Sequence, residues 1–470
     1  MKRSLVSLSL VVLAVALLVG AAQAPPAAAL SFAPHVEHPV GGASPYFIAV
    51  GDVNANGKAD MVTANANVGN NSVSVLLGDG SGGFALGPGS PVAVGLQPEA
   101  VAIGEFNSDG NADLATADTG ANTVSVLLGN GLGGFAPAVP PAYATAGGPT
   151  AIVVADFNGD TFADVATANN AGNATVLLGN GAGVFAPAPG SPFATGAAPM
   201  GLVAGDFNGD TFVDLATVNQ GANTVSVLLG NGLGAFGPPL ASPTGNAPFD
   251  IATADFDSDG RLDLATNNLG TNTVSALLNT SVGGLLSFAP NVDTFAGAMP
   301  WGLAAADFDG DGRPDLATVT GWLPFSSDAT VLLGDGLGGF PTVATFDTPD
   351  YQAMSIAAGD FNGGKPDLVV GNFLVGANSV SVLRNTTRAK ITAIKPAKGK
   401  PGATATITGK GFGDLRGKAK VLFGSKAAGK YVMWSQTKIK VKVPALPGGT
   451  VSVKVKTVEG KSNAKSFRVL

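Results

Sequence analysis

Short apolar runs recur along the chain, each bounded by Gly, Asn or Asp. From residue 100 onward they read AVAIGEF, DLATAD and TVSVLLG, and a fourth run, FAPAVPPAYAT, follows them. Runs of this length, rich in Val, Leu and Ala and separated by turn residues, predict short β-strands rather than helices. We therefore expect each such unit to supply four strands.

An acidic loop separates the first and second runs of every unit. The seven loops begin at Asp52, Glu105, Asp156, Asp206, Asp255, Asp307 and Asp360. The unit thus repeats with a period of about 50 residues, which is typical of repeat architectures. Four antiparallel strands repeated around one axis form the blades of a β-propeller. The sequence predicts an all-β fold with a seven-bladed β-propeller over residues 30–387.

The two ends of the repeat region favour a closed ring over a linear solenoid. The fourth-strand pattern already occurs as SFAP at residues 31–34, whereas the last unit stops at SVLRN, residues 381–385, without a fourth strand. We expect the N-terminal strand to complete the last blade, because this pairing removes an open sheet edge. Small residues before the loops, as in IAVG and LAAA, suit innermost strands crowded around the axis.

Charge divides the chain near Arg388. Residues 388–470 contain 19 Lys and Arg against two acids, whereas residues 30–387 contain five basic residues against 31 acids. The tail alternates apolar residues with Lys, as in TKIKVKVP and TVSVKVKTV, which predicts a small β-sandwich over residues 388–470. Its basic face could bind an anionic polymer, dock on the acidic propeller or simply be solvated.

The first residues, MKRSLVSLSLVVLAVALLVGAAQA, have a basic start, an apolar run and then small residues. This order predicts a signal peptide within residues 1–29, cleaved between residues 22 and 29, with an uncleaved anchor as the alternative. No later apolar stretch approaches membrane-spanning length. We expect a secreted or extracellular protein, in the periplasm or at the cell surface in some settings. The chain has no Cys, so a bound ion is a candidate staple.

The sixth loop, DFDGDGRPD, shows what the repeated acids are suited to do. It has acids at positions 1, 3, 5 and 9 and Gly at position 6. Oxygens at alternate positions before a sharp turn are typical of Ca²⁺ loops, with a backbone carbonyl as the ligand at position 7. An EF-hand instead closes at position 12 and lies between helices, so we predict a calcium site in a β-hairpin. A catalytic carboxylate cluster and plain turns are the alternatives.

The copies differ in their acids, so we expect them to differ in affinity. Loops five and six carry four acids each, loops three and four have Thr at position 6, and loop one has only two acids. Loop seven is one residue short and is expected to hold no ion. We predict structural Ca²⁺ at five or six sites. Loop by loop, the predicted ligand positions are Asp52, Asn54, Asn56, Lys58 and Asp60; Glu105, Asn107, Asp109, Asn111 and Asp113; Asp156, Asn158, Asp160, Phe162 and Asp164; Asp206, Asn208, Asp210, Phe212 and Asp214; Asp255, Asp257, Asp259, Arg261 and Asp263; and Asp307, Asp309, Asp311, Arg313 and Asp315.

These motifs carry a family resemblance. The pattern P-x-x-[IVL]-A-x-[GA]-D-F-[ND]-x-D-G-x-x-D-L, followed by NTVSVLLGNG-x-G-x-F, resembles the FG-GAP or VCBS repeat of integrin α heads and secreted bacterial proteins, over about residues 31–386. The resemblance implies a seven-bladed propeller with calcium between the first and second strands. The tail, with ITAIKPAKGKPGATATITGKGFG and FRVL, resembles an IPT/TIG domain, an immunoglobulin-like fold that serves as a spacer or interaction module.

The resemblance also implies that partners bind the face opposite the calcium loops. Six residues before each loop start lies a position that varies while its neighbours repeat. A ring of recognition residues and simple packing between blades are the two interpretations of this position. A second candidate contact is the turn GWLPFSS, with Trp322 and Phe325. The varying positions are Tyr46, Glu99, Thr150, Met200, Phe249, Trp301 and Met354.

The sequence offers little for catalysis. Its two histidines, His35 and His38, lie on the expected closing strand, and no G-x-S-x-G, Walker or H-E-x-x-H motif occurs. Glu99 and Asp250 are the only rim acids outside the loops. We expect a non-catalytic recognition, adhesion or scaffold protein that binds an unidentified protein or glycan rather than nucleic acid. The alternative is a secreted carbohydrate-active enzyme or lectin.

Overall fold

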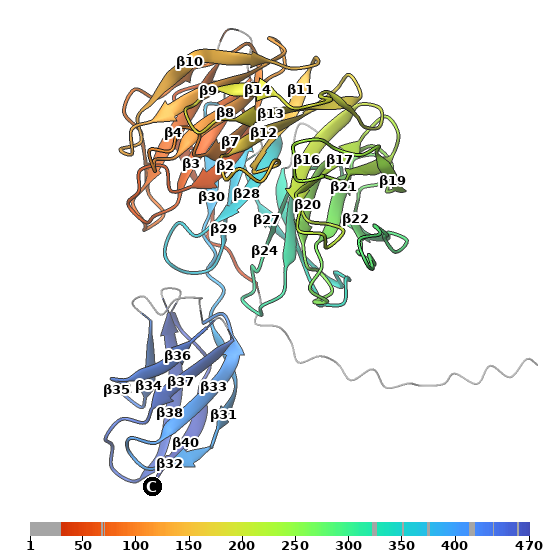
Figure 1. Cartoon of the computed structure of the whole chain (residues 1–470). Helices are drawn as coiled ribbons and strands as arrows, with labels where there is room; N and C mark the ends of the chain where they lie inside the picture. Colours follow the sequence, from red (N-terminus) through yellow and green to blue (C-terminus); the bar gives the residue numbers. More distant parts are fainter. Residues whose placement is uncertain are drawn as a thin grey trace, which may run out of the picture.

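The computed structural model describes residues 30–470 except 67–68, 70, 322–326, 350–351, 374–376, 413–418, 436 and 458–459. The predicted signal peptide and the predicted contact residues Trp322 and Phe325 lie outside the described residues. Every regular element within the described residues is a β-strand, so the predicted all-β class is confirmed. The strands form a ring of sheets followed by a smaller two-sheet body (Figure 1).

Seven antiparallel sheets make up the ring in the part of the chain that the structure describes. In six of these sheets the chain runs outward from the axis strand by strand, and in the seventh β1 is the outermost strand. The first strands are β2 (Pro45–Gly51), β7 (Pro98–Gly104), β11 (Pro149–Ala155), β16 (Pro199–Gly205), β20 (Pro248–Ala254), β24 (Pro300–Ala306) and β28 (Ala353–Gly359). The second strands are β3 (Asp60–Asn65), β8 (Asp113–Asp118), β12 (Asp164–Asn169), β17 (Asp214–Asn219), β21 (Asp263–Asn268), β25 (Asp315–Thr320) and β29 (Asp367–Asn372).

The outer half of each sheet holds the remaining strands. The third strands are β4 (Ser72–Gly78), β9 (Thr123–Gly129), β13 (Asn173–Gly179), β18 (Thr224–Leu228), β22 (Thr273–Leu277), β26 (Asp328–Leu333) and β30 (Ser379–Leu383). The outermost strands are β5 (Phe84–Leu86) with β6 (Val92–Ala93), β10 (Phe135–Ala144), β14 (Phe185–Pro187) with β15 (Phe193–Ala194), β19 (Leu240–Pro243), β23 (Val292–Phe295), β27 (Thr342–Asp347) and β1 (Val36–Pro39).

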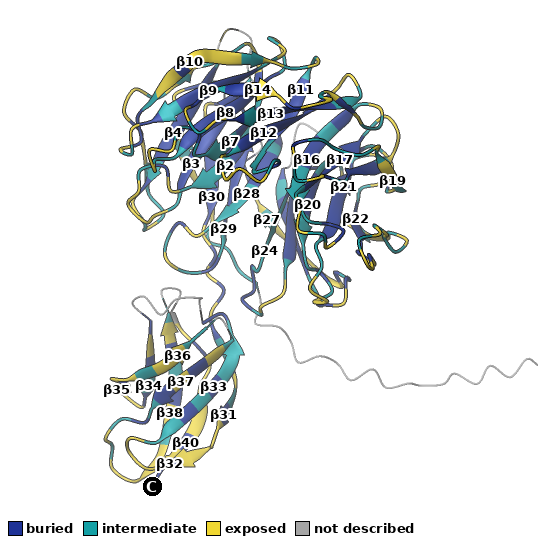
Figure 2. Cartoon of the chain, in the orientation of Figure 1, coloured by how far each residue is buried: buried dark blue, intermediate teal, exposed yellow. Residues whose placement is uncertain are grey.

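The first strands line the axis and close the ring. Each contacts the first strand of the next sheet, and β28 contacts β2. Their small residues permit this approach: a Cβ on Gly302 of β24 would lie 2.7 Å from the backbone nitrogen of Ile356 in β28. The second strands are buried throughout, as the dark blue centre of each blade shows (Figure 2). These features confirm the propeller.

The N-terminal strand completes the last blade. β1 pairs antiparallel with β30, with Val36 opposite Val382 and Pro39 opposite Ser379. Phe32 forms an isolated bridge with Asn385, so the regular strand begins after the SFAP segment rather than within it. The two ends of the propeller are therefore held in one sheet, whose outer edge is formed by the start of the chain.

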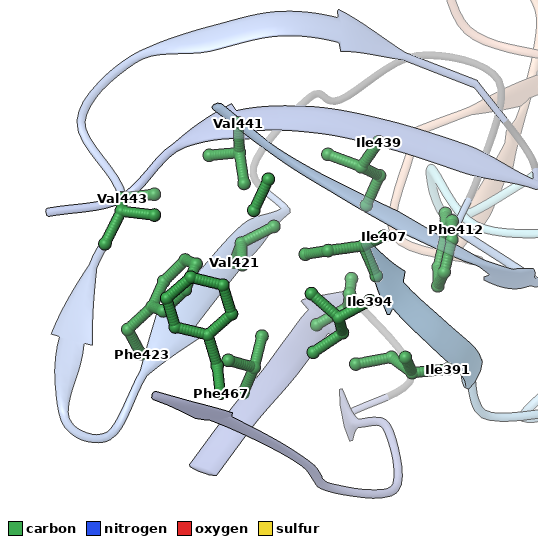
Figure 3. Close-up of a cluster of buried hydrophobic side chains, with 14 of the residues drawn as sticks. Ile391, Ile394, Ile407, Phe412, Val421, Phe423, Ile439, Val441, Val443 and Phe467 are labelled. Atoms are coloured by element: carbon green, nitrogen blue, oxygen red, sulfur yellow. The ribbon is translucent and has the colours of Figure 1, made fainter. Parts of the chain in front are cut away.

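The C-terminal body is a two-sheet sandwich, which confirms the predicted immunoglobulin-like domain. Its core includes Ile391, Ile407, Val421, Ile439 and Phe467, contributed by both sheets (Figure 3). On β37 the lysines Lys438 and Lys440 are exposed, because they alternate with buried residues. One sheet contains β31 (Lys390–Lys395), β33 (Thr404–Lys410), β37 (Lys438–Lys442) and β36 (Tyr431–Trp434). The other contains β32 (Lys398–Gly399), β40 (Lys465–Val469), β38 (Gly449–Thr457), β34 (Lys420–Phe423), β35 (Lys426–Ala427) and β39 (Gly460–Lys461).

Candidate functional site

Each acidic loop connects the first strand of a blade to the second, so the loops lie at one end of the first strands. Position 6 of loops one to six has a left-handed backbone, for example φ 87° at Gly312. Thr161 and Thr211 hold the same conformation, at φ 74° and 77°. A β-branched residue is strained there, so loops three and four carry backbone strain.

The carboxylate at position 1 holds the loop in shape. In loop six, Asp307 Oδ1 accepts hydrogen bonds from the backbone N–H groups of Gly310 at 2.7 Å and Asp311 at 2.9 Å. Asp307 Oδ2 accepts a third from Gly312 at 2.7 Å. Asp311 Oδ1 accepts one from Arg313 at 3.1 Å. These bonds fix the backbone of the loop between positions 1 and 7.

The carboxylate at position 9 braces the blade. It is buried in every loop, and both of its oxygens accept backbone hydrogen bonds. In loop three, Asp164 Oδ2 accepts from Phe157 at 2.9 Å and Oδ1 accepts from Gly179, at the end of β13, at 2.7 Å. The same pair of bonds, at 2.6 to 3.0 Å, forms at Asp60, Asp113, Asp214, Asp263, Asp315 and Asp367. The sequence pointed to a metal ligand here but gave no sign of this second role.

Burial raises the pKa of the position 9 carboxyls, because desolvation disfavours their charged form. The pKa is raised to about 6 at Asp164, Asp214 and Asp263, and to about 8 at Asp315. The backbone donors lower these values, and the neighbouring loop acids raise them further. A cation in the loop would favour the charged carboxylate and offset the desolvation.

Two loops bring their acids together closely enough for a metal ion. Carboxylate oxygens of Asp255, Asp257 and Asp263 lie within 4.8 Å of one another, and those of Asp307, Asp309 and Asp315 do the same. These are loops five and six, the two with four acids. Hard oxygen donors at this spacing suit Ca²⁺. In loop six, Asp309 Oδ1 is buried and has no hydrogen-bond partner, so this donor set fits a cation.

Loop six also contacts the C-terminal sandwich; docking on the propeller was one of the alternatives for the basic tail, although the sequence did not indicate which residues would meet. Lys410, at the end of β33, forms salt bridges with Asp309 and, at 3.8 Å, with Asp311. Gly411 N–H donates to the Gly310 carbonyl at 2.5 Å. Charge contrast between the two domains was the only sequence signal, and it does not single out Lys410 among 19 basic residues.

Loop seven is arranged differently from the other six. Asp360 Oδ1 accepts three backbone hydrogen bonds from residues 362–364. Lys365 is only 2% exposed and donates to the carbonyls of Asp309 at 3.1 Å and Thr387 at 2.9 Å. The brace at Asp367 is kept. The Lys365 ammonium thus reaches loop six and the end of the propeller region, and the absence of an ion from loop seven stays a prediction.

The seven varying positions lie at the opposite end of the first strands. Six of them line a cavity of about 40 Å³ on the axis, namely Tyr46, Glu99, Thr150, Met200, Phe249 and Met354. None of the seven is exposed. Trp301 is 8% exposed and packs edge-on against Phe249, with ring centroids 4.8 Å apart. These positions therefore pack between blades and also converge on the axis.

The candidate catalytic side chains have structural partners. Asp250 accepts backbone hydrogen bonds from Ile251 and, across to β24, from Leu303, each at 2.9 Å. Burial raises the pKa of Asp250 to about 6 and that of Glu99 to about 7. His38 lies edge-on to Phe84, with ring centroids 5.1 Å apart, and burial lowers its pKa. These contacts give each of the three side chains a place in the packing of the ring.

A ring of antiparallel sheets with an acidic loop at the same end of each, followed by a two-sheet sandwich, defines a repeat propeller with candidate metal loops. Comparison with protein families identifies the repeats. The FG-GAP-like repeat family matches residues 52–116, 105–167, 156–217 and 206–266. The FG-GAP repeat family matches residues 299–323. The IPT/TIG domain matches residues 389–469. The chain belongs to the FG-GAP repeat proteins and ends in an IPT/TIG domain, as the sequence resemblance implied.

Characterised relatives match only part of the chain. A cyclomaltodextrin glucanotransferase of Bacillus sp. (strain 1-1) is 41% identical over 106 residues, which are 22% of this chain and 15% of the relative. The corresponding protein of Paenibacillus macerans is 43% identical over 81 residues, 16% of this chain and 11% of the relative. The chain thus spans a small fraction of the length of these enzymes.

Among solved structures, the crystal structure of BBS1N in complex with ARL6DN, soaked with lead, resembles the chain in fold. The TM-score is 0.51 at 12% sequence identity, over 75% of this chain and 96% of that one. At this identity the likeness concerns the fold alone. Within the described residues, no helix has the length and apolar character needed to cross a membrane.

Proposed function

We propose that the chain is a secreted, calcium-binding, non-catalytic recognition or scaffold protein. The observation that carries the proposal is the convergence of carboxylate oxygens within 4.8 Å in loops five and six, on a framework that repeats around the ring. Acids so close repel one another unless a cation lies between them. The basic and apolar N-terminal sequence supports secretion.

Calcium in this proposal is structural. The propeller region carries 31 acids against five basic residues, and the chain has no disulfide to stabilise it outside the cell. Ions bound only by the folded state would neutralise much of this charge and stabilise the ring by mass action. The loops would supply the side chains at positions 1, 3, 5 and 9 and the backbone carbonyl at position 7.

Calcium titration of the metal-free protein tests this proposal. We expect several ions to bind and the melting temperature to rise, because each independent site held at 100 times its Kd adds about 2.7 kcal/mol of stability. Asp257→Asn should remove or weaken one site. The matched control is Asp347→Asn, an exposed acid on β27 outside the loops, which should leave the isotherm unchanged. An isotherm without binding would contradict the proposal.

The arrangement of the remaining acids supports a non-catalytic role. Paired carboxylates act as acid and base when they face a shared substrate space. Asp250 instead accepts from Ile251 of its own strand through Oδ1 and from Leu303 of β24 through Oδ2, and the cavity beside it measures about 40 Å³. A sugar ring does not fit that volume. A partner on this face would therefore lie across the rim rather than inside the channel.

Carbohydrate binding is the second candidate, because parts of the chain resemble cyclomaltodextrin glucanotransferases. A glycan array that includes cyclic and linear glucans, run beside a pull-down from the producing cell's envelope, distinguishes a glycan from a protein partner. Phe249→Ala and Thr450→Ala provide the contrast: Phe249 lies at the axial rim, whereas Thr450 is exposed on the sandwich. Loss of binding only with Phe249→Ala would place the partner at the rim.

A further inference from the structure

The contact between the two domains is built on the sixth acidic loop. The ammonium of Lys410 touches Asp309 at position 3 and lies 3.8 Å from Asp311 at position 5. These side chains are two of the predicted cation ligands. The Lys410 and Asp309 side chains are only 18% and 4% exposed, so the pair is largely removed from water. An ammonium from one domain thus lies where the other domain gathers its acids.

The sandwich holds Lys410 firmly in this place. Phe412 is 1% exposed within the sandwich core, and its carbonyl accepts a hydrogen bond from Trp434 Nε1 at 3.1 Å. Gly411 has φ 69° and donates to the Gly310 carbonyl, so the backbones of the two domains touch beside the salt bridge. The contact is therefore a specific docking arrangement rather than a chance approach of a long side chain.

Lys410 leaves part of the cation site unsatisfied. Asp309 Oδ1 is buried without a hydrogen-bond partner, although Lys410 occupies Oδ2. Oxygens of Asp307, Asp309 and Asp315 still lie within 4.8 Å of one another. A buried carboxylate oxygen without a partner is costly, and a divalent cation would satisfy it. The Lys410 ammonium therefore satisfies the loop-six carboxylates only in part, and a divalent cation would satisfy them more fully.

Calcium and the Lys410 ammonium compete for these carboxylates. Calcium takes its oxygen ligands at about 2.3–2.6 Å, and a cation held on the same carboxylate repels it. We propose that the two cations exclude each other at loop six, so that calcium binding to this loop releases the IPT/TIG domain from the propeller. This inference rests on the proposed calcium binding and adds a regulatory role for one of its sites.

Loop five provides an internal comparison. It has the same acids at positions 1, 3, 5 and 9 and Arg at position 7, and its Arg261 pairs with Asp259 as Arg313 pairs with Asp311. Among the described residues, no basic residue of the sandwich forms a salt bridge with loop five. The two loops therefore differ in Lys410, which contacts the loop-six carboxylates, and in Lys365, whose ammonium donates to the backbone carbonyl of Asp309. Linkage is reciprocal, so docking must weaken calcium at loop six by the same factor by which calcium weakens docking.

The test combines calcium titration with a distance measurement on the full chain. Because the sequence has no Cys, Leu132→Cys and Thr450→Cys give one label on each domain at exposed positions. In metal-free protein we expect a narrow distribution of label distances, and in excess calcium a broad one. Lys410→Met keeps the apolar stem and removes the charge. Its label distances should be broadly distributed with and without calcium, and it should bind one calcium ion about tenfold or more tightly than the parent chain.

Two further variants separate the inference from the proposed function. Asp309→Asn should lose one calcium site, and its label distances should be broadly distributed without calcium. Asp257→Asn in loop five should also lose a site, yet should keep the narrow distribution without calcium and the broad one with it. If the parent chain binds calcium but Lys410→Met shows the same isotherm and the same distances, the inference fails alone. If neither the parent nor Lys410→Met binds calcium, both the inference and the proposed function fail.

Discussion

Threonine at position 6 of loops three and four adopts a backbone conformation that glycine adopts in the other complete loops. Thr161 and Thr211 have φ 74° and 77°, compared with 75° at Gly57 and 90° at Gly260. A left-handed conformation costs a residue with a Cβ roughly 1–2 kcal/mol. The loop keeps its shape because the position 1 carboxylate accepts the N–H of this same residue, at 2.8 Å in both loops. Two of the loops therefore hold strain within an intact hydrogen-bond pattern.

Relief of this strain should stabilise the protein. Thr161→Gly removes the left-handed cost but adds the entropy of a glycine in the unfolded chain, about 0.5–1 kcal/mol. We expect a net gain of about 0.5–1 kcal/mol in the free energy of unfolding of metal-free protein, measured with urea. Gly110→Thr in loop two, where φ is 79°, is the reverse control and should destabilise. A neutral or harmful Thr161→Gly would show that the threonine side chain contributes contacts of its own.

Glu99, one of the acids at the axial cavity, should also make the free energy of unfolding depend on pH. Burial raises the pKa of Glu99 from 4.5 to about 7. The folded state then binds its proton more tightly than the unfolded state, so the free energy of unfolding is highest below pH 4.5 and falls as pH rises through 7. Between pH 5 and 8, we expect the free energy of unfolding to fall by about 2 kcal/mol less in Glu99→Gln than in the parent protein. Urea unfolding of both metal-free proteins at the two pH values measures it; equal falls would contradict the assignment.

At the scale of the element, the acidic loop and the strands around it do two separate jobs. Acids of the loop are the candidate ion ligands, and in loops five and six the position 9 carboxylate converges with those at positions 1 and 3. The carboxylate at position 9 also ties the loop to the end of the third strand. In loop three these roles belong to Asp160, whose side chain is exposed, and Asp164, which is 0% exposed. The hairpin therefore has a brace that does not depend on metal.

Alanine substitutions separate the two jobs. Asp164→Ala leaves the N–H groups of Phe157 and Gly179 without their acceptor, at a cost of about 1–3 kcal/mol each. Relief of the buried charge offsets part of this, so we expect a net loss of roughly 2 kcal/mol in metal-free protein, and a larger loss in excess calcium because Asp164 is also a predicted ligand. Asp160→Ala should cost little in metal-free protein and more in excess calcium. Denaturation in chelator and in calcium compares them; equal behaviour of the two variants would exclude a separate brace.

The sequence predicted elements better than contacts between them. Turn residues and apolar runs were enough to predict the strands, and the fixed spacing of the acids was enough to predict the loops. Both signals are local and repeat along the chain. The brace at Asp164 was hidden because one residue type serves as metal ligand and as hydrogen-bond acceptor. Lys410 was hidden because one lysine among many has no local signal of a partner 101 positions earlier. Packing between blades at Trp301 was one of two interpretations, and the sequence alone does not choose between them because the contact with Phe249 depends on how neighbouring blades meet.

At the scale of the whole molecule, the ring is closed by pairing between residues far apart in the chain. β1 supplies the fourth strand of the last blade, and Ser31 N–H donates to Thr387 Oγ1 at 2.9 Å. This hydrogen bond lies next to the junction with the sandwich, where Lys365 donates to the Thr387 carbonyl. Closure of the propeller and attachment of the IPT/TIG domain therefore meet at one place.

Removal of the closing strand should open the ring at this place. A variant that begins at residue 41 lacks β1, so β30 becomes an unpaired edge that can pair with another chain. We expect its melting temperature to fall by several degrees and its mass in solution, measured by light scattering, to rise above that of a monomer. The control begins at residue 30 and keeps the strand. A monomeric variant with unchanged melting temperature would contradict closure by β1.

The brace at position 9 has a consequence for engineering. It is kept in loop seven, where Asp367 accepts from Phe361 and Asn385 although the acids at positions 3 and 5 are missing. Under the proposed calcium binding, the number of ion sites can therefore be edited blade by blade, since acids can be removed from one loop or added to another without dismantling the hairpin that carries them. A series of otherwise identical rings with different numbers of ions would show how many charges a propeller of this kind tolerates before it needs them neutralised.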